Sequence, residues 1–366
     1  MRKRKKVFLL VTIFLLVLLA GCISDSPEQK KINKQNIEQA KINAQNYIEQ
    51  KYGFTAEITD AILERQHGIF GSSPRSTVLV KMQYDGKEFN VYIDGANVNI
   101  DGADDYQVEL ITESIESFFT ELIPGECSIY LLGGDVRVSY DEIENEFDIM
   151  FSNYFDGTNF DEVLGKSRCE IVAEYVQQDF SSLGEECFSN KMFSSENIYV
   201  TFISYRSHDC MQMVGRDHSN DEKYVVYIDN DLSINNGVIT KKTYEIGHFD
   251  DFYYYVPGGV PEDVTFRKIV PDDEDCWDGH GIIDGTFLTD AYSVNCDYEC
   301  EVYIYYPWNE LENLPTEKIS MTICREKEGE KKYSADVSMF CNVGEYIVYE
   351  IPVEKDDSLY FAFMKK

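Results

Sequence analysis

Three cysteines and one histidine in the C-terminal half form the constellation with the clearest chemical meaning. Cys276, His280, Cys296 and Cys300 follow the spacing C-x3-H-x15-C-x3-C. Zinc favours four thiolate or imidazole ligands, and these often come as two close pairs. The spacing therefore predicts a zinc site, provided that a turn near Asp297 brings Cys296 and Cys300 together. Four residues of extended strand would separate the two cysteines by about 13 Å, which is too far for one ion.

Aromatic residues are the second group whose types and spacing suggest a function. Phe252, Tyr253, Tyr254 and Tyr255 are consecutive, and Trp308 follows a further tyrosine-rich stretch. Exposed aromatic rings bind glycans and peptides by stacking and by apolar contact. These five residues are therefore candidate binding residues. The alternative is that they fill a β core, because every second side chain of a strand points toward one face.

A catalytic centre is harder to find. His208 and Cys210 are close in sequence, and a cysteine–histidine pair can act as a nucleophile and its base. However, many pairs among ten cysteines and five histidines would look equally good. The chain has no glycine-rich phosphate loop, no G-x-S-x-G and no H-E-x-x-H motif. We therefore expect no catalytic residues and a protein that is not an enzyme.

The N-terminal residues predict where the protein works. Basic residues at positions 2–6 precede an apolar run from Val7 to Ala20, and Leu19-Ala20-Gly21-Cys22 follows. This order is typical of a secretory signal. The last four residues resemble the lipobox of bacterial lipoproteins. The resemblance implies a signal peptide over residues 1–21, cleavage before Cys22, a lipid on the Cys22 thiol and attachment to the extracytoplasmic face of the cell membrane. The alternative is an uncleaved N-terminal anchor.

If the protein is exported, the remaining nine cysteines can form disulfides, since these bonds form in extracytoplasmic compartments. An odd number leaves at least one thiol unpaired within the chain. Disulfides from Cys296 or Cys300 to Cys324 or Cys341, or burial as free thiols, are the alternatives to zinc. Spacing alone does not fix the connectivity.

Charge limits the partners. The chain has 33 basic and 66 acidic residues, a net charge of −33, and removal of the five basic signal residues would make it −38. Nucleic acid is excluded as a partner, because phosphate backbones require basic patches. Anionic headgroups would also repel this surface, so the lipid would be the membrane attachment. The abundance of lysine, asparagine, isoleucine and tyrosine is typical of AT-rich Gram-positive genomes.

The first folded unit is predicted over residues 27–124, after a polar tether at 22–35 that overlaps it. Ser26-Pro27 predicts a helix start and Gly53 its end. Three alternating strands follow, with a hairpin turn at Asp85-Gly86. A second amphipathic helix runs to Pro124-Gly125. The pattern predicts helices packed on an antiparallel sheet.

A second α+β domain is predicted over residues 125–270. A helix is expected behind Ser139, and strands at Cys169–Val176, Ile198–Tyr205 and Tyr224–Ile228. The string at 224–229 is similar to that at 89–94, which suggests a diverged repeat of the first unit. A chance match of a short β-prone string is the alternative.

The C-terminal part is predicted to be an all-β, sandwich-like domain over residues 282–366, after an acidic, glycine-rich linker at 271–281. Its apolar residues alternate in short runs, as in Val302, Ile304 and Tyr306. The fold class is thus α+β, with this β domain last. The layout loosely resembles clostridial and other Firmicutes lipoproteins of unknown function with cystatin-like or NTF2-like modules, a likeness that implies no activity.

These observations together predict a membrane-anchored extracytoplasmic lipoprotein of a Gram-positive bacterium. We expect it to bind a protein, a peptide or a glycan without catalysing a reaction. One alternative is a zinc-dependent envelope protein that uses Cys276, His280, Cys296 and Cys300. The other is a purely structural spacer with no ligand and no cofactor.

Overall fold

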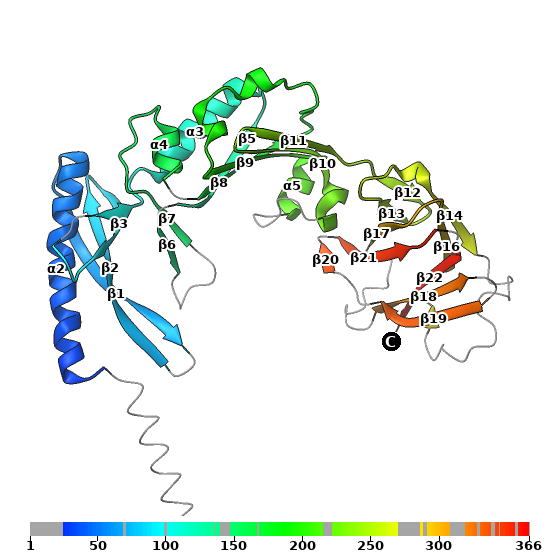
Figure 1. Cartoon of the computed structure of the whole chain (residues 1–366), viewed down its shortest axis with the longest axis horizontal. Helices are drawn as coiled ribbons and strands as arrows, with labels where there is room; N and C mark the ends of the chain where they lie inside the picture. The colour runs from blue at the N-terminus through cyan, green and yellow to red at the C-terminus, as the bar shows by residue number, and fades with distance from the viewer. Residues whose placement is uncertain are drawn as a thin grey trace, which may run out of the picture.

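A computed structural model of the chain describes residues 25–68, 71–98, 101–134, 136–139, 147–166, 168–214, 222–269, 286–287, 291–307, 319–327, 330–337, 341–343, 345–355 and 358–365. The predicted signal peptide, Cys22 and the linker lie outside these residues. The fold is mainly β, with helices packed on antiparallel sheets. Its parts follow one another along an arch, from the α2 layer at one end to the C-terminal sheets at the other (Figure 1). Within the described ranges, no helix is both long and apolar enough to cross a membrane.

The first layer is one helix on one sheet. Helix α2 (Pro27–Tyr52) packs against a four-stranded antiparallel sheet in the order β1-β2-β3-β4. The strands are β1 (Glu57–Gly68), β2 (Gly71–Tyr84), β3 (Lys87–Asp94) and β4 (Gly102–Asp104). The β2–β3 turn has φ of 48° at Asp85 and 81° at Gly86, the left-handed region that a tight hairpin turn requires.

Helix α2 begins and ends where its capping residues predict. The Ser26 hydroxyl accepts a hydrogen bond from the Gln29 backbone N–H at 3.1 Å, and Gly53 adopts a left-handed conformation at the end. The predicted tether is therefore wrong for residues 27–35, because this cap starts the helix at Pro27 and makes those residues helical.

The middle layer is a five-stranded sheet in the order β11-β10-β9-β8-β5. Its strands are β5 (Cys127–Gly133), β8 (Cys169–Val176), β9 (Ile198–Tyr205), β10 (Ile228–Asn235) and β11 (Val238–Thr243). Strands β8 and β9 are parallel, and all other neighbours are antiparallel. A parallel pair needs a long crossover. Here the crossover contains the short 3₁₀ helices η1 (Glu185–Phe188) and η2 (Lys191–Ser194).

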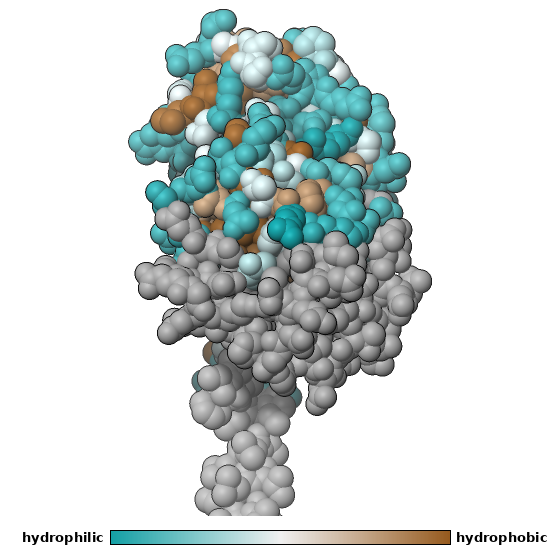
Figure 2. Space-filling view, turned by 90° about the vertical axis from the view of Figure 1, so that its right-hand side faces the viewer, coloured by the Kyte–Doolittle hydropathy of each residue, from teal (hydrophilic) through white to brown (hydrophobic). Residues whose placement is uncertain are grey.

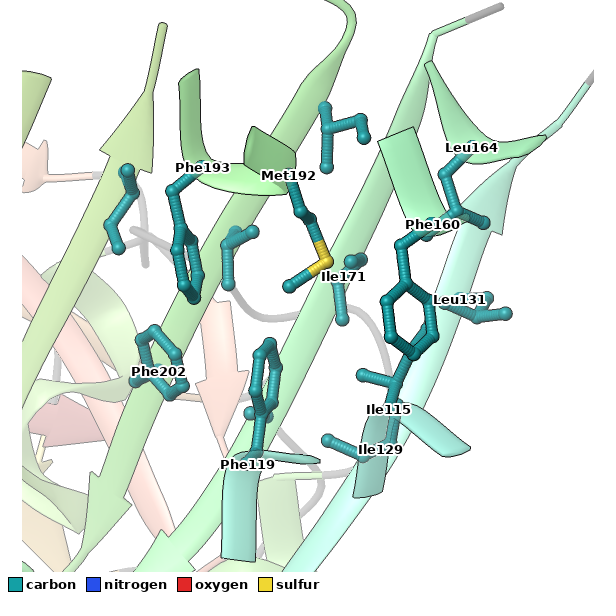
Figure 3. Packing of buried hydrophobic residues seen from close by; sticks show 14 of the residues in the cluster. Ile115, Phe119, Ile129, Leu131, Phe160, Leu164, Ile171, Met192, Phe193 and Phe202 are labelled. Atoms are coloured by element: carbon teal, nitrogen blue, oxygen red, sulfur yellow. The ribbon is translucent and has the colours of Figure 1, made fainter. Parts of the chain in front are cut away.

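The largest core among the described residues lies on one face of this sheet. Helix α3 (Val108–Leu122), helix α4 (Phe160–Leu164) and η2 cover that face. Figure 3 shows Ile115 and Phe119 of α3 packed with Ile129 and Leu131 of β5, Ile171 of β8, Phe202 of β9 and the η2 residues Met192 and Phe193. We predicted α3 as part of the 27–124 unit, but its apolar stripe is buried against the middle sheet.

Two local predictions in this region are wrong. The helix expected behind Ser139 is in part a strand, β7 (Phe147–Met150), which pairs with β6 (Val136–Ser139). Consecutive side chains of β7 pack in different clusters. Ile149 packs against the α3 core, and Met150 packs against Leu79 and Ala103. That two-sided burial favours a strand over a helix.

The expected strand at 224–228 is mostly a 3₁₀ helix, η3 (Glu222–Tyr227). Val225, Val226 and Tyr227 are all buried, in one cluster with Ile203 and Tyr205 of β9, and such tertiary packing overrides a local strand pattern. Since the matching string at 89–94 lies in β3, the two segments have different conformations, and the repeat is not supported there.

The C-terminal part contains two sheets. One has the order β12-β13-β17-β21-β20, and the other has the order β14-β16-β22-β18-β19, with β15 paired to β22. The first comprises β12 (Gly247–Phe249), β13 (Phe252–Tyr255), β17 (Cys300–Pro307), β21 (Tyr346–Val353) and β20 (Cys341–Val343). The second comprises β14 (Val264–Ile269), β15 (Thr286–Phe287), β16 (Ala291–Cys296), β22 (Ser358–Lys365), β18 (Ile319–Lys327) and β19 (Glu330–Val337).

The predicted boundary before this part is wrong. Strands β12 to β14 precede the expected linker at 271–281, yet β13 pairs with β17 and β14 pairs with β16. Their apolar residues Phe252, Val264 and Phe266 belong to the same buried cluster as residues of β17 and β22. The structural unit therefore begins near residue 247, because these strands have their hydrogen-bonding and packing partners at the C-terminus.

Candidate functional site

The two faces of the middle sheet have different surroundings. On β5, Ile129 and Leu131 point into the α3 core, so Ser128 and Tyr130 point to the opposite face. On β8, Ile171 and Ala173 point into the core, and Val172 and Glu174 lie on the opposite face. Helix α5 (His208–Val214), which follows β9, packs on that opposite face.

A cavity of about 370 Å³ lies between β5, β8 and α5. Its lining comes from three elements and one preceding residue: Ser128 and Tyr130 of β5, Glu174 and Val176 of β8, His208, Met211 and Gln212 of α5, and Glu126. Two of these are carboxylates, and none of these described lining residues is lysine or arginine. The described lining therefore carries a negative formal charge.

Glu174 is a buried charged residue in the lining of this cavity. It is 4% exposed, and it lies directly opposite Ser128 in the β5–β8 register. Its Oε1 accepts a hydrogen bond from the Tyr205 hydroxyl at 2.7 Å. Burial and the charge of Glu174 raise the pKa of Tyr205, so the phenol remains a neutral donor. The hydrogen bond from Tyr205 helps to fix the orientation of the Glu174 side chain.

The predicted histidine–cysteine pair is only partly at this site. His208 lines the cavity, whereas Cys210 packs against the adjacent buried cluster that contains Val172 and Tyr205. The Cys210 sulfur accepts a hydrogen bond from the Ser207 hydroxyl at 3.2 Å. This contact gives Cys210 a local structural partner.

The aromatic residues predicted to bind are mainly core residues. Phe252 is fully buried, and Tyr254 and Tyr255 are each 9% exposed. Tyr253 is half-buried, with its ring edge-on to Tyr346. Burial removes the stacking faces that a glycan would need, so these four residues do not form an exposed platform. Trp308 lies outside the described residues.

The surface near these strands is mainly hydrophilic. Figure 2 views the molecule from the side of the C-terminal sheets, and hydrophobic residues there are interspersed among hydrophilic ones on the coloured surface. On this coloured surface, the arrangement favours a water-exposed face over an apolar docking face.

The predicted zinc ligands are described only in part. Cys276 and His280 lie outside the described residues. Cys296 ends β16 and Cys300 begins β17, so the turn that chelation requires is present. Within the part of the chain that the structure describes, three or more His, Cys, Asp or Glu side chains do not gather as a metal site would require. The zinc site therefore stays a prediction.

A second buried polar cluster joins the first layer to the middle one. Asp104 accepts hydrogen bonds from Lys51 at 2.6 Å, Tyr47 at 2.8 Å and Tyr52 at 2.7 Å. Lys51 also donates to the backbone oxygen of Phe151 at 2.7 Å. Burial and Asp104 raise the pKa of Tyr52, so its hydroxyl stays a donor. Since its three side-chain donors come from α2 and Lys51 also reaches the Phe151 backbone, this cluster is a structural junction.

Sequence reasoning missed the Glu174 cavity, although one signal was available. Cys169–Val176 was predicted as a strand, and Glu174 is a charged residue within its apolar run. A charge inside a buried strand requires a partner or a function. The chain gives no match when compared with models of protein families, with curated proteins or with solved structures.

Proposed function

We propose that this chain is a lipid-anchored extracytoplasmic protein that binds a cationic side chain of a peptide or protein in the Glu174 cavity. The observation that carries the proposal is the buried Glu174 carboxylate, oriented by Tyr205 at the wall of a cavity of about 370 Å³. Together with Glu126 it makes the described lining acidic, and a carboxylate forms its strongest hydrogen bonds with a group that brings an opposite charge and donors. A lysine ammonium has both.

The other lining residues suit the same ligand. Glu126 adds a second negative charge, and the Tyr130 ring can contact the apolar stem of a lysine or interact with its ammonium group. The cavity volume lies toward the lower end of the range usual for ligand sites, about 300–1,000 Å³. We infer one side chain as the occupant, with the rest of the peptide outside.

The remaining architecture fits a binding protein on a membrane surface. The proposed lipid on Cys22 would hold the chain at the extracytoplasmic face, while the net charge of −33 would attract basic partners at long range. The two C-terminal sheets contribute to one buried cluster, which supports a sandwich-like unit. No catalytic group is assigned.

The test is binding of immobilised pentapeptides with a central lysine, compared with the same peptides carrying Nε-acetyl-lysine. We expect binding of the lysine peptides only, because acetylation removes the charge. Glu174→Gln should weaken binding at least tenfold, since it leaves the ammonium without its buried counter-charge. Glutamine keeps an oxygen that can accept from Tyr205, so folding should be preserved.

The matched control is Glu113→Gln, which removes one carboxylate from the exposed side of α3, on the other face of the sheet. It should leave binding within twofold of the parent. Equal losses in Glu113→Gln and Glu174→Gln would show that only net charge matters. If no lysine peptide binds the parent protein, the structural-spacer alternative is favoured.

A further inference from the structure

The turn between β16 and β17 connects the two C-terminal sheets. Cys296, the last residue of β16, pairs with Val264 in one sheet. Cys300, the first residue of β17, pairs with Val353 in the other. Residues 297–299 form the only covalent link between these two strand ends. The two cysteines thus lie on either side of a crossover from one sheet to the other.

The turn also brings the two thiols together. Cys296 is 6% exposed within the core cluster, and Cys300 packs against the same cluster at intermediate exposure. Both thiols are free in this structure, and three residues of one turn separate them. A disulfide requires adjacent side chains of this kind, with little backbone movement between the reduced and oxidised forms.

Contacts from a neighbouring segment hold the turn in place. The Tyr298 hydroxyl donates to Asp263 Oδ2 at 2.8 Å, and the Val260 backbone N–H donates to the same oxygen at 3.2 Å. The Tyr298 hydroxyl lies over Gly259, where a Cβ atom would come within 2.2 Å of it. The thiol pair is therefore preorganised by packing, and not only by its closeness in sequence.

We propose that Cys296 and Cys300 form a disulfide that ties the two C-terminal sheets together at this corner. The oxidant is an external disulfide, either of low molecular weight or on a thiol oxidoreductase. The thiolate of the more exposed Cys300 attacks one sulfur of the oxidant and releases the other as a thiol. The Cys296 thiolate then attacks the Cys300 sulfur and releases the second thiol. The two protein thiols lose two electrons and two protons, and the external disulfide gains them.

A static bond fits this environment better than a redox catalyst. Cys296 is 6% exposed within the core cluster, whereas catalytic cysteines are accessible to their partners. The inference does not depend on the Glu174 cavity.

Peptide mapping of the full-length protein tests the bond directly. The protein is equilibrated in a buffer of oxidised and reduced glutathione, its free thiols are alkylated, and it is digested without reduction by a glutamate-specific protease. Cleavage after Glu299 separates the two cysteines, so a Cys296–Cys300 disulfide appears as two peptides that reduction releases. Alkylation of both residues, or linkage of either one to Cys276, Cys324 or Cys341, would overturn the proposal.

Thermal unfolding gives an independent readout. For a loop this short, oxidation should raise the melting temperature by about 5 °C, and Cys300→Ser should abolish the rise. Cys210→Ser, which removes a half-buried thiol elsewhere, should leave the rise intact. Stoichiometric zinc that protects Cys296 and Cys300 from alkylation would replace the disulfide with the metal site. A rise that persists in Cys300→Ser would also contradict the bond.

Discussion

At the scale of single residues, burial determines which charges the fold tolerates. Asp231 on β10 is 4% exposed. One of its carboxylate oxygens accepts from the Tyr244 hydroxyl, and the other has no hydrogen-bond partner in the described structure. Burial raises the pKa of Asp231 above its usual value, with Tyr244 partly opposing the shift. The charge on Asp231 therefore destabilises the folded state at neutral pH.

We expect Asp231→Asn to stabilise the protein at neutral pH by about 1 kcal/mol, since one pKa unit corresponds to about 1.4 kcal/mol. Because the folded pKa of Asp231 is raised, the contribution of this residue to stability is fully present below the unfolded pKa, near pH 4, and is lost as the pH rises through the folded pKa. The difference between variant and parent should shrink toward pH 4. Urea unfolding at several pH values measures it.

Asp250 provides the control of opposite sign. Lys268 donates to its carboxylate at 2.7 Å and lowers the pKa of Asp250. Its contribution to stability is present above the unfolded pKa and is lost as the pH falls through the folded pKa. Asp250→Asn should therefore destabilise the protein at neutral pH and have no effect in acid. The same pH trend in both variants would refute the argument from burial.

Residues such as Glu174 show where sequence reasoning stops. The alternation along β8 indicates which of its residues share a face. However, β5 was not predicted, so the partner strand that places Ser128 and Tyr130 beside Glu174 was unknown. With 66 acidic residues in the chain, no single carboxylate stands out without its neighbours. Sites built across strands depend on register, which one sequence does not reveal.

At the scale of elements, the Asp104 cluster connects α2 to the middle layer. The Lys51–Asp104 pair has side chains that are 6% and 0% exposed. We expect Lys51→Met to reduce the free energy of unfolding by about 3 kcal/mol, because it leaves a buried carboxylate without its cation. Denaturant unfolding measures the loss. Lys41→Met, which breaks the exposed pair with Glu38, should change it by less than about 1 kcal/mol.

The double variant Lys51→Met, Asp104→Asn distinguishes charge from packing. If the loss comes from an uncompensated charge, neutralising Asp104 should recover much of it. A double variant no more stable than Lys51→Met alone would mean that the lysine acts through its contacts with Tyr47 and Phe151.

Elements with local signals were predicted well from sequence. The α2 caps, the Asp85-Gly86 hairpin and the β8 and β9 bounds are confirmed, because capping, turn and alternation signals lie within the elements themselves. The layer to which α3 belongs, the β7 strand and the 3₁₀ helix at 222–227 were predicted wrongly. Each of these depends on partners far away in the sequence, and tertiary burial overrides the local pattern.

At the scale of the whole molecule, segments that pack in one layer are not always consecutive in the sequence. Strand β13 pairs with β17 and β14 pairs with β16, so the C-terminal sheets are closed by segments from both sides of the predicted linker. A change in amino-acid composition indicates where a chain is polar, but it does not indicate where one hydrophobic core ends and the next begins. The disulfide proposed at Cys296 and Cys300 would strengthen one corner of this assembly.

Attachment to the membrane is a property of the whole chain that one residue tests. If Cys22 carries the lipid, Cys22→Ser should move the protein from the membrane fraction to the soluble or secreted fraction, because a net charge of −33 is repelled by anionic headgroups. Cys210→Ser is the matched control and should remain with the membrane. Fractionation with immunoblotting, and the mass of the mature N-terminus, measure both. A Cys22→Ser protein that stays in the membrane with residues 1–21 still present would instead support an uncleaved anchor. A cleaved one that stays there would require a second attachment, to a membrane partner, for which the Glu174 cavity is the first surface to test.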